Sequence, residues 1–285
     1  MFGSDSMVCT EKKTERFFSH GIENWDDYHD GYLNFGLWEN DITDYVEAAR
    51  HLLARVGEKI EINEDSHILD VGCGMGTQDR FFAERFKCKR IEAVDLTKKH
   101  IAVAKRKLSC SEHKGKIRYS VGNACKLPFK KRSFTHVISI EAPVNFVTRD
   151  HFFKEAFSFL KPDGRIGLSD FYIKGKPATP VGSFFTGVCA HFWHIPKENR
   201  YDLDTYRKKL EDVGFVDIEL EQVEDDVIPG YYFEQKRKEV KKSLAKIRGW
   251  RNARLSLALD YVSYRLWKSG IAGYVLVSAR KPSGC

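Results

Sequence analysis

The feature that most constrains this chain is a glycine-rich turn between an apolar strand and a helix, in the segment HILDVGCGMGTQDRFF, which starts at residue 67. The strand ends at Asp70, and Gly72, Gly74 and Gly76 follow before the helix begins. Glycine is needed where the backbone turns tightly and must approach a ligand with no Cβ in the way. The G-x-G-x-G spacing differs from the G-x-G-x-x-G of dinucleotide enzymes. Besides a binding site for another ligand, this turn could be a nicotinamide site or a turn that binds no ligand.

Strands and helices alternate along much of the chain. A helix is expected to start at Asp44, which has capping-box spacing from Glu47, and to stop at Gly57. A turn is expected at 161–164. Repeated strand–helix–strand units predict an α/β fold in which helices cover both faces of a parallel sheet. The apolar patterns predict helices at 77–86, 97–108, 150–160 and 204–213, and strands at 67–71, 90–95, 117–121, 135–140, 165–171, 215–223 and 272–280.

Three segments fall outside this alternation. Residues 1–43 are expected to form an N-terminal cover, and residues 44–285 the main domain, with lid insertions at about 172–203 and 224–270. Insertions at strand ends are where α/β folds carry substrate specificity. Their aromatic residues could form the roof of an apolar pocket, and ordinary core packing is the alternative for most of them. These residues are Tyr28, Tyr32, Phe35, Trp38, Phe184, Phe185, Phe192 and Trp193.

Three polar residues follow the next predicted strands. Asp95 ends the second strand, nineteen residues after Gly76, where a carboxylate can hold a ribose diol. Asn123 lies in GNACKLPF after the third strand and can meet an adenine edge. Glu141 ends the strand THVISIEA, beside the expected cofactor crevice. These residues together predict one binding site at the carboxyl ends of the strands.

Together these elements resemble the class I S-adenosylmethionine-dependent methyltransferases. The matching patterns are "D-x-G-x-G-x-G", an acid after strand two, "G-D-A-x-x-L-P-F" and "L-K-P-G-G-R", over roughly residues 64–171. The segments YLNFGLW and ISIEAPVNF are similar to the small-molecule and lipid group, which includes sugar O-, tocopherol and sterol C-, and phosphoethanolamine methyltransferases and cyclopropane synthases. The resemblance implies a Rossmann-like, seven-stranded, mostly parallel sheet whose last strand is antiparallel, with helical lid insertions.

The resemblance also implies S-adenosylmethionine as the cofactor. Asp95 would bind its ribose, and Asn123 with Ala124 and Leu127 would border its adenine. The full set of expected cofactor-binding residues is Asp70, Gly72, Gly74, Gly76, Gln78, Asp95, Leu96, Asn123, Ala124 and Glu141.

The catalytic residues are less well marked. Val144 and Asn145 stand where the sugar O-methyltransferases often carry His-His, which removes an obvious general base. Asp170, Glu141 and Asn145 are the catalytic candidates, although Asp170 could equally be a strand-end acid that caps local amides. A site poor in bases suits an alkene carbon or a neutral amine as the acceptor, while oxygen acceptors share the same scaffold.

The charge distribution bears on the partner. The net charge is +7, and residues 235–254 hold nine basic residues and one acid. This segment could bind an anionic acceptor or contact a membrane peripherally, and a solvated helix is the alternative. An RNA methyltransferase and a non-catalytic cofactor-binding protein are the competing functions. No nucleic-acid partner is expected, because the chain has no N-P-P-[FY] motif, no Pro-Cys pair and no recognisable RNA-binding appendage.

Cysteine and histidine usage indicates the compartment and the metal content. The seven cysteines form no C-x-x-C pair, and the N-terminus has no apolar segment typical of a secretory signal. We therefore expect reduced thiols and a cytoplasmic location. His191 and His194 form an H-x-x-H without a third ligand nearby, so no metal site is expected.

Overall fold

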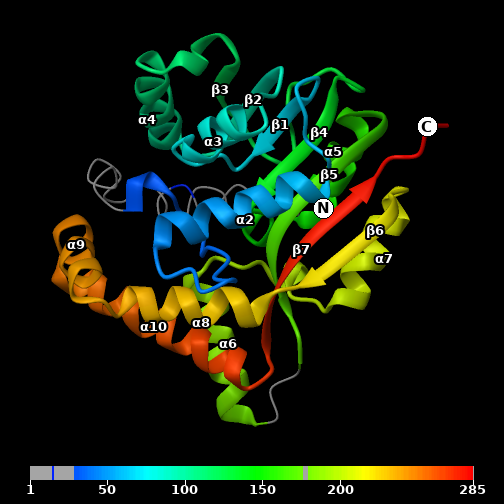
Figure 1. Cartoon of the computed structure of the whole chain (residues 1–285). Helices are drawn as coiled ribbons and strands as arrows, with labels where there is room; N and C mark the ends of the chain where they lie inside the picture. Colours follow the sequence, from blue (N-terminus) through cyan, green and yellow to red (C-terminus); the bar gives the residue numbers. More distant parts are fainter. Residues whose placement is uncertain (1–14, 16–28, 176–178, 285) are drawn as a thin grey trace.

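The computed structural model describes residue 15 and residues 29–175 and 179–284. Within these residues, seven strands form one sheet in the order β3-β2-β1-β4-β5-β7-β6 (Figure 1). Neighbouring strands from β3 to β5 are parallel, and β7 is antiparallel to both β5 and β6. The strands are β1 (His67–Val71), β2 (Arg90–Asp95), β3 (Ile117–Val121), β4 (Phe134–Ile140), β5 (Leu160–Ile173), β6 (Val216–Gln222) and β7 (Ala272–Arg280).

Helices cover both faces of the sheet. α2 (Tyr45–Lys59), α3 (Thr77–Arg85) and α4 (Lys98–Ser109) pack on one face, and α5 (Arg149–Phe159) and α7 (Leu203–Val213) on the other. Successive strand residues alternate between the two apolar cores: Ile68 joins the first core and Leu69 the second. This alternation follows from the twofold side-chain period of a strand. The predicted Rossmann-like sheet with an antiparallel last strand is confirmed.

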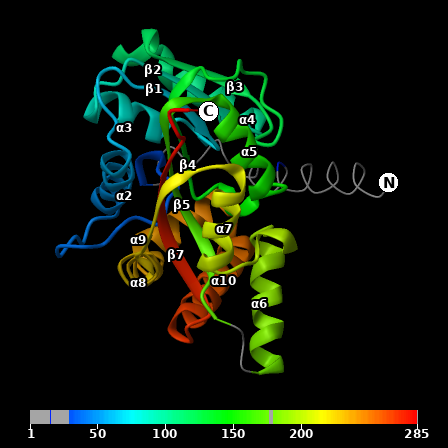
Figure 2. The ribbon, with the colours of Figure 1, turned by 90° about the vertical axis from the view of Figure 1, so that its right-hand side faces the viewer.

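The remaining helices lie beyond the carboxyl ends of the parallel strands. α6 (Pro180–Phe192) follows β5, and α8 (Glu224–Gln235), α9 (Lys238–Arg248) and α10 (Trp250–Lys268) connect β6 to β7. α10 packs against α6, α8 and α9, so the four helices form one cap below the sheet (Figure 2). Among the described residues, no helix combines the length and apolar character needed to cross a membrane.

Three of the predicted element boundaries are wrong. α2 continues through Gly57 to Lys59, because Gly57 is buried where the ring of Phe86 would lie 2.5 Å from an added Cβ. This glycine lets α2 approach α3 and does not end the helix. The predicted turn at 161–164 lies within β5, where Asp163 and Gly164 exchange backbone hydrogen bonds with Lys281. The other end of β5 extends to Ile173, which pairs with Ala272, so residues 172 and 173 belong to the sheet.

Candidate active site

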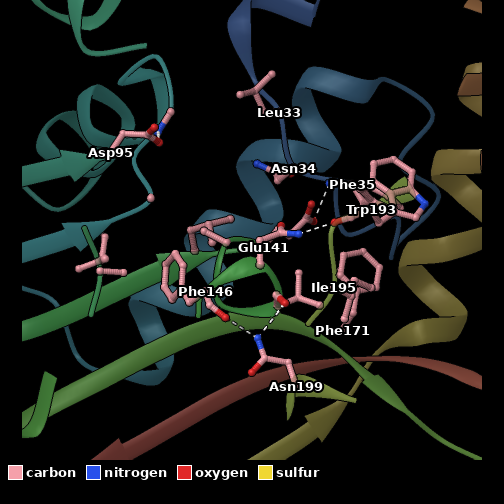
Figure 3. A pocket seen from close by; sticks show the side chains of 18 of the residues that line it. Leu33, Asn34, Phe35, Asp95, Glu141, Phe146, Phe171, Trp193, Ile195 and Asn199 are labelled. Carbon is pink, nitrogen blue, oxygen red and sulfur yellow. Dashed lines mark hydrogen bonds between the residues drawn. The ribbon is translucent and has the colours of Figure 1, made fainter. Parts of the chain in front are cut away.

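A cavity of about 320 Å³ opens at the carboxyl ends of the strands. Its walls come from the ends of β1, β2, β4 and β5, from residues 31–35, and from the cap helices α6 and α10. Figure 3 shows Asp95 on one side, Phe35, Phe171 and Trp193 on the other, and Glu141 between them. This spatial order of the side chains across the cavity follows from the strand order β2-β1-β4-β5 in the sheet.

The three glycines of the turn serve different purposes. All three have positive φ, between 55° and 87°. A Cβ on Gly72 would lie 2.3 Å from that of Ala142, and one on Gly76 would lie 2.3 Å from the hydroxyl oxygen of Tyr119. A Cβ on Gly74 would meet only the Leu33 side chain, at 3.2 Å. Gly72 and Gly76 are therefore required by packing, whereas Gly74 leaves the backbone open to a ligand in the cavity.

Asp95 presents an ionised carboxylate at the end of β2. It accepts hydrogen bonds from the backbone amides of Gly74 (2.9 Å) and Thr97 (2.7 Å), and its Oδ1 lies 3.1 Å from Nδ1 of His100. Burial alone would raise the pKa of Asp95, but these hydrogen bonds outweigh it and hold the pKa below its ordinary value. A carboxylate at this position fits the hydroxyl groups of a ribose.

The expected cofactor-binding residues separate into two groups. Eight of them line the cavity: Gly72, Gly74, Gln78, Asp95, Leu96, Asn123, Ala124 and Glu141. Asp70 and Gly76 lie behind this surface. Asp70 is fully buried and accepts a 2.6 Å hydrogen bond from Nε2 of Gln78, so it positions a residue of the wall. Burial and the neighbouring Asp79 raise the pKa of Asp70 well above its usual range.

The other side of the cavity is apolar. Phe35 stacks on Tyr231 with ring centroids 3.7 Å apart and meets Phe171 and Trp193 edge-on, at 5.1 and 6.4 Å. Ile195 and Cys189 extend this wall. Burial raises the pKa of the Cys189 thiol to about 11, so the thiol is protonated at neutral pH. This half suits an apolar ligand and excludes water.

Glu141 joins the two halves of the cavity. Its Oε1 accepts hydrogen bonds from the Phe35 amide (2.7 Å) and the Tyr274 hydroxyl (2.6 Å). Burial raises the pKa of Glu141 to about 8 in spite of these two donors. Glu141 also has a φ of 55°, a left-handed conformation that is costly for a residue with a side chain and that recurs at functional sites.

The structure places the candidate Asp170 outside the cavity. The side chains of Asp170 and Arg149 are both fully buried and form an ion pair, with 2.7 Å between Oδ2 and Nε. The Tyr206 hydroxyl donates to the same carboxylate oxygen at 3.0 Å. Asp170 lies inside β5 rather than at its end, because the strand continues to Ile173. Its neighbours are those of a structural acid.

Arg149 extends this network to the loop that carries Asn145. Its backbone amide donates to Oδ1 of Asn199 at 3.0 Å, and the Asn199 amide donates to the carbonyls of Val144 (3.0 Å) and Phe146 (2.8 Å). Asn145 lines the cavity, but its amide is already donated to the carbonyls of Trp193 and His194. The hydrogen bonds of Asn145 therefore hold the segment after α6 against the end of β4.

Sequence reasoning placed some aromatic residues wrongly and missed other wall residues. Tyr32, Phe35 and Trp193 line the cavity, Tyr28 lies outside the described residues, and Phe184 and Phe185 point outward with 66% and 43% of their surface exposed. Gly31, Leu33, Asn34, His100, Asn199 and Arg200 also line the cavity. Leu33 and Asn34 lie in the segment YLNFGLW, which carries part of the resemblance, whereas no local pattern marks His100, Asn199 or Arg200.

Comparison with known proteins agrees with this geometry. A family described as "Methyltransferase domain" matches residues 68–164. Erythromycin 3''-O-methyltransferase of Saccharopolyspora erythraea is 32% identical over 272 residues, which cover 88% of this chain and 84% of that protein.

Two solved structures share the fold. The cyclopropane synthase of Mycobacterium tuberculosis superposes with a TM-score of 0.78 at 16% identity, covering 93% of each chain. Geranyl diphosphate C-methyltransferase of Streptomyces coelicolor, in complex with S-adenosyl-L-homocysteine, gives 0.71 at 20% identity, covering 95% of this chain and 97% of the other. With the glycine turn and Asp95 in place, the chain belongs to the class I S-adenosylmethionine-dependent methyltransferases and methylates a small-molecule acceptor.

Proposed function

We propose that the acceptor is an apolar molecule methylated on a hydroxyl oxygen, with Glu141 as the group that accepts the proton. The observation that carries this proposal is the position of a carboxyl group with a pKa of about 8 between the two halves of the cavity. Sequence comparison alone suggested a site without an obvious base. Glu141 supplies one directly after β4, three and four residues before Val144 and Asn145, where the sugar-methylating relatives often carry His-His.

The geometry of Glu141 fits this role. Both hydrogen bonds from Phe35 and Tyr274 reach Oε1, and no described residue donates to Oε2. The two donors fix the orientation of the carboxyl group and leave its second oxygen available to an acceptor. A carboxylate whose pKa lies near the working pH removes a proton far more effectively than an ordinary glutamate.

The other wall residues bind and orient. When bound, S-adenosylmethionine supplies an activated methyl group, so little further chemistry is asked of the protein. The Gly74 backbone and Asp95 would hold the cofactor, while Phe35 and Trp193 exclude water from the acceptor. The hydroxyl proton would pass to Glu141 as the methyl–sulfur bond breaks and the methyl group bonds to the acceptor oxygen, which leaves S-adenosylhomocysteine. Asn145 and Asp170 act as positioning residues, because each holds a wall segment in place.

Arg200 points to an anionic group on the acceptor. Its guanidinium lines the cavity and donates only to the Ile195 carbonyl, at 2.8 and 3.2 Å, and no carboxylate among the described residues pairs with it. Burial lowers the pKa of Arg200, with Glu198 opposing. An arginine that is partly desolvated and lacks a carboxylate partner favours a carboxylate or phosphate on the ligand.

A carbon acceptor is the second candidate. The stacked Phe35 and Tyr231 rings and the edge of Trp193 form an aromatic wall that could stabilise a cation developing on an alkene. The structural likeness to a geranyl diphosphate C-methyltransferase concerns the fold alone. The named activity of the erythromycin relative favours oxygen.

The pH dependence of turnover tests the role of Glu141. We expect kcat to rise with pH through about 8, because the carboxylate form accepts the proton. Glu141→Gln should lower kcat about 100-fold and remove this dependence. Glu224→Gln is the matched control, because Glu224 is a buried carboxylate that does not line the cavity. An unchanged pH profile in Glu141→Gln would favour a carbon acceptor or a different base.

We also propose that the protein acts in the cytoplasm. Cys73, Cys88, Cys110 and Cys189 are free thiols in the structure. Free thiols fit a reducing compartment. Fractionation of cells that express the full chain, followed by detection with an antibody, would test this location, and recovery from the medium would contradict it.

A further inference from the structure

The helical cap carries large apolar side chains on its outer surface. Trp250 is 64% exposed, Phe233 55% and Tyr261 44%. On α10, Trp250 and Tyr261 recur on the same side of the helix as Arg254, Arg265 and Lys268, because residues separated by three, four, seven or eleven positions share one helical face. One side of α10 thus presents aromatic and basic residues together.

Contacts between rings join this side of α10 to α8. The Tyr232 ring stacks on that of Tyr264 with centroids 4.4 Å apart, and Phe233 meets Tyr264 at 5.8 Å. Cations also lie over rings on this surface. Nζ of Lys236 is 5.4 Å from the centroid of the Tyr232 ring, and the guanidinium carbon of Arg265 is 5.8 Å from the centroid of the Tyr261 ring. We call this surface, with Trp250 and Arg254, the cap face.

The surface around the cap face is mainly positive, although Asp225 at the start of α8 is exposed and accepts a 2.8 Å hydrogen bond from Nε1 of Trp267. Within residues 236–268, all of which are described, Glu239 is the only exposed acid, because Asp260 is buried. The cap face itself carries the exposed cations Lys236, Arg254, Arg265 and Lys268, and Lys241 and Lys242 on the neighbouring helix α9 are also exposed. A partner of this surface must therefore accept aromatic side chains and also carry negative charge.

The cap face lies directly outside the acceptor half of the cavity. Ser263 and Leu266 on α10 line the cavity, and Tyr261 and Arg265 lie on the outward side of the same two helical turns. Figure 2 shows α6, α8, α9 and α10 together at the end of the molecule beyond β5 and β7. A surface that bound this end would lie next to the helices enclosing the acceptor.

We propose that the cap face docks on an anionic lipid bilayer. Tyrosine and tryptophan with flanking lysine and arginine suit the boundary between headgroups and acyl chains, because the rings bury apolar area while the cations meet phosphates. Single-stranded nucleic acid would need open ring faces for base stacking. The Tyr232 and Tyr264 faces are turned toward each other, at an interplanar angle of 17°, which favours lipid.

Vesicle flotation of the full chain tests the proposal. We expect binding to vesicles of phosphatidylcholine mixed with phosphatidylglycerol, weak binding to phosphatidylcholine alone, and a decrease at high salt. The double variant Lys236→Glu/Arg265→Glu should weaken binding by roughly tenfold or more, since each basic residue near an anionic surface contributes to it. Phe233→Ser/Tyr261→Ser should weaken binding even at low salt, since it removes apolar area.

The matched control is Lys130→Glu/Lys131→Glu. It makes the same charge change at exposed residues that precede β4, at the opposite end of the sheet. An equal loss in this control would overturn the proposal, because only net charge would then matter. The proposal would also be overturned if the protein did not bind vesicles and the cap face were instead required for binding an RNA oligonucleotide. The same holds if the cap face were instead required for self-association, as measured by light scattering. Unchanged S-adenosylhomocysteine affinity in each variant shows that the fold and cofactor site are intact.

Discussion

Asp95 and the glycine turn, which form the cofactor half of the cavity, lie within one strand–helix–strand unit, whereas the acceptor half collects side chains from Phe35 to Ala272. The first half uses backbone atoms and one carboxylate that local amides hold in place. The second depends on long-range contacts such as Phe35 with Glu141, 106 residues apart. The cofactor site is therefore local in sequence, and the acceptor site is a product of the whole fold.

The largest expected effect is on stability, for a substitution of Asp170, which lies outside both halves of the cavity. Asp170→Asn leaves the fully buried Arg149 without its charge partner, and we expect a loss of about 3–5 kcal/mol in the free energy of unfolding. Urea denaturation measures it. Asp163→Asn, which breaks an exposed pair with Arg280, should cost less than about 1 kcal/mol. Normal stability with lost turnover would instead return Asp170 to a catalytic role.

A smaller and more local effect is expected at Asp95. Asp95→Ala should weaken S-adenosylmethionine binding by about 1.5–3 kcal/mol, the scale of charge-assisted hydrogen bonds, as measured by calorimetry. The free energy of unfolding should fall less than in Asp170→Asn. Glu92→Gln, on the same strand but outside the cavity, is the control. Unchanged affinity in Asp95→Ala would remove Asp95 from the cofactor half.

Arg200 should affect the acceptor alone. Replacing Arg200 with methionine keeps an apolar stem but removes the charge, and we expect the KM for an anionic acceptor to rise roughly tenfold with little change in kcat. Cofactor affinity should stay the same. Arg207→Met changes an exposed arginine on α7 and serves as the control. Equal effects of Arg200→Met on cofactor and acceptor would break the division of the cavity into halves.

The smallest effect is expected in backbone dynamics. We propose that α6 and α10 close over the acceptor as a lid, because both line the cavity and both lie at its outer edge. Hydrogen exchange in these helices should slow when S-adenosylhomocysteine and acceptor are bound together, while exchange in α5 and α7 stays constant. Uniform exchange with and without ligands would argue against a lid.

Most of the sheet could be predicted because its strands carry periodic patterns and its turns carry glycines with a backbone requirement. Strands β1, β2, β3 and β7 have the bounds expected from sequence. The prediction that α2 ends at Gly57 is wrong because this glycine leaves room for the ring of Phe86, which follows another helix. Asp170 could not be assigned because nothing near it in the sequence shows that Arg149, 21 positions earlier, is its buried partner.

The fold and the polar residues at the strand ends can be predicted from the sequence, because they depend on local periodicity and on the backbone freedom of glycine, and the resemblance of these motifs to a known family implies the cofactor. The raised pKa of Glu141, the position of Arg200 in the cavity wall and the outward direction of Phe184 and Phe185 are visible only in the folded structure. These properties follow from burial and from neighbours far away in the chain. Desolvation, which raises the pKa of Glu141, exists only once β4, β7 and the N-terminal segment have packed together.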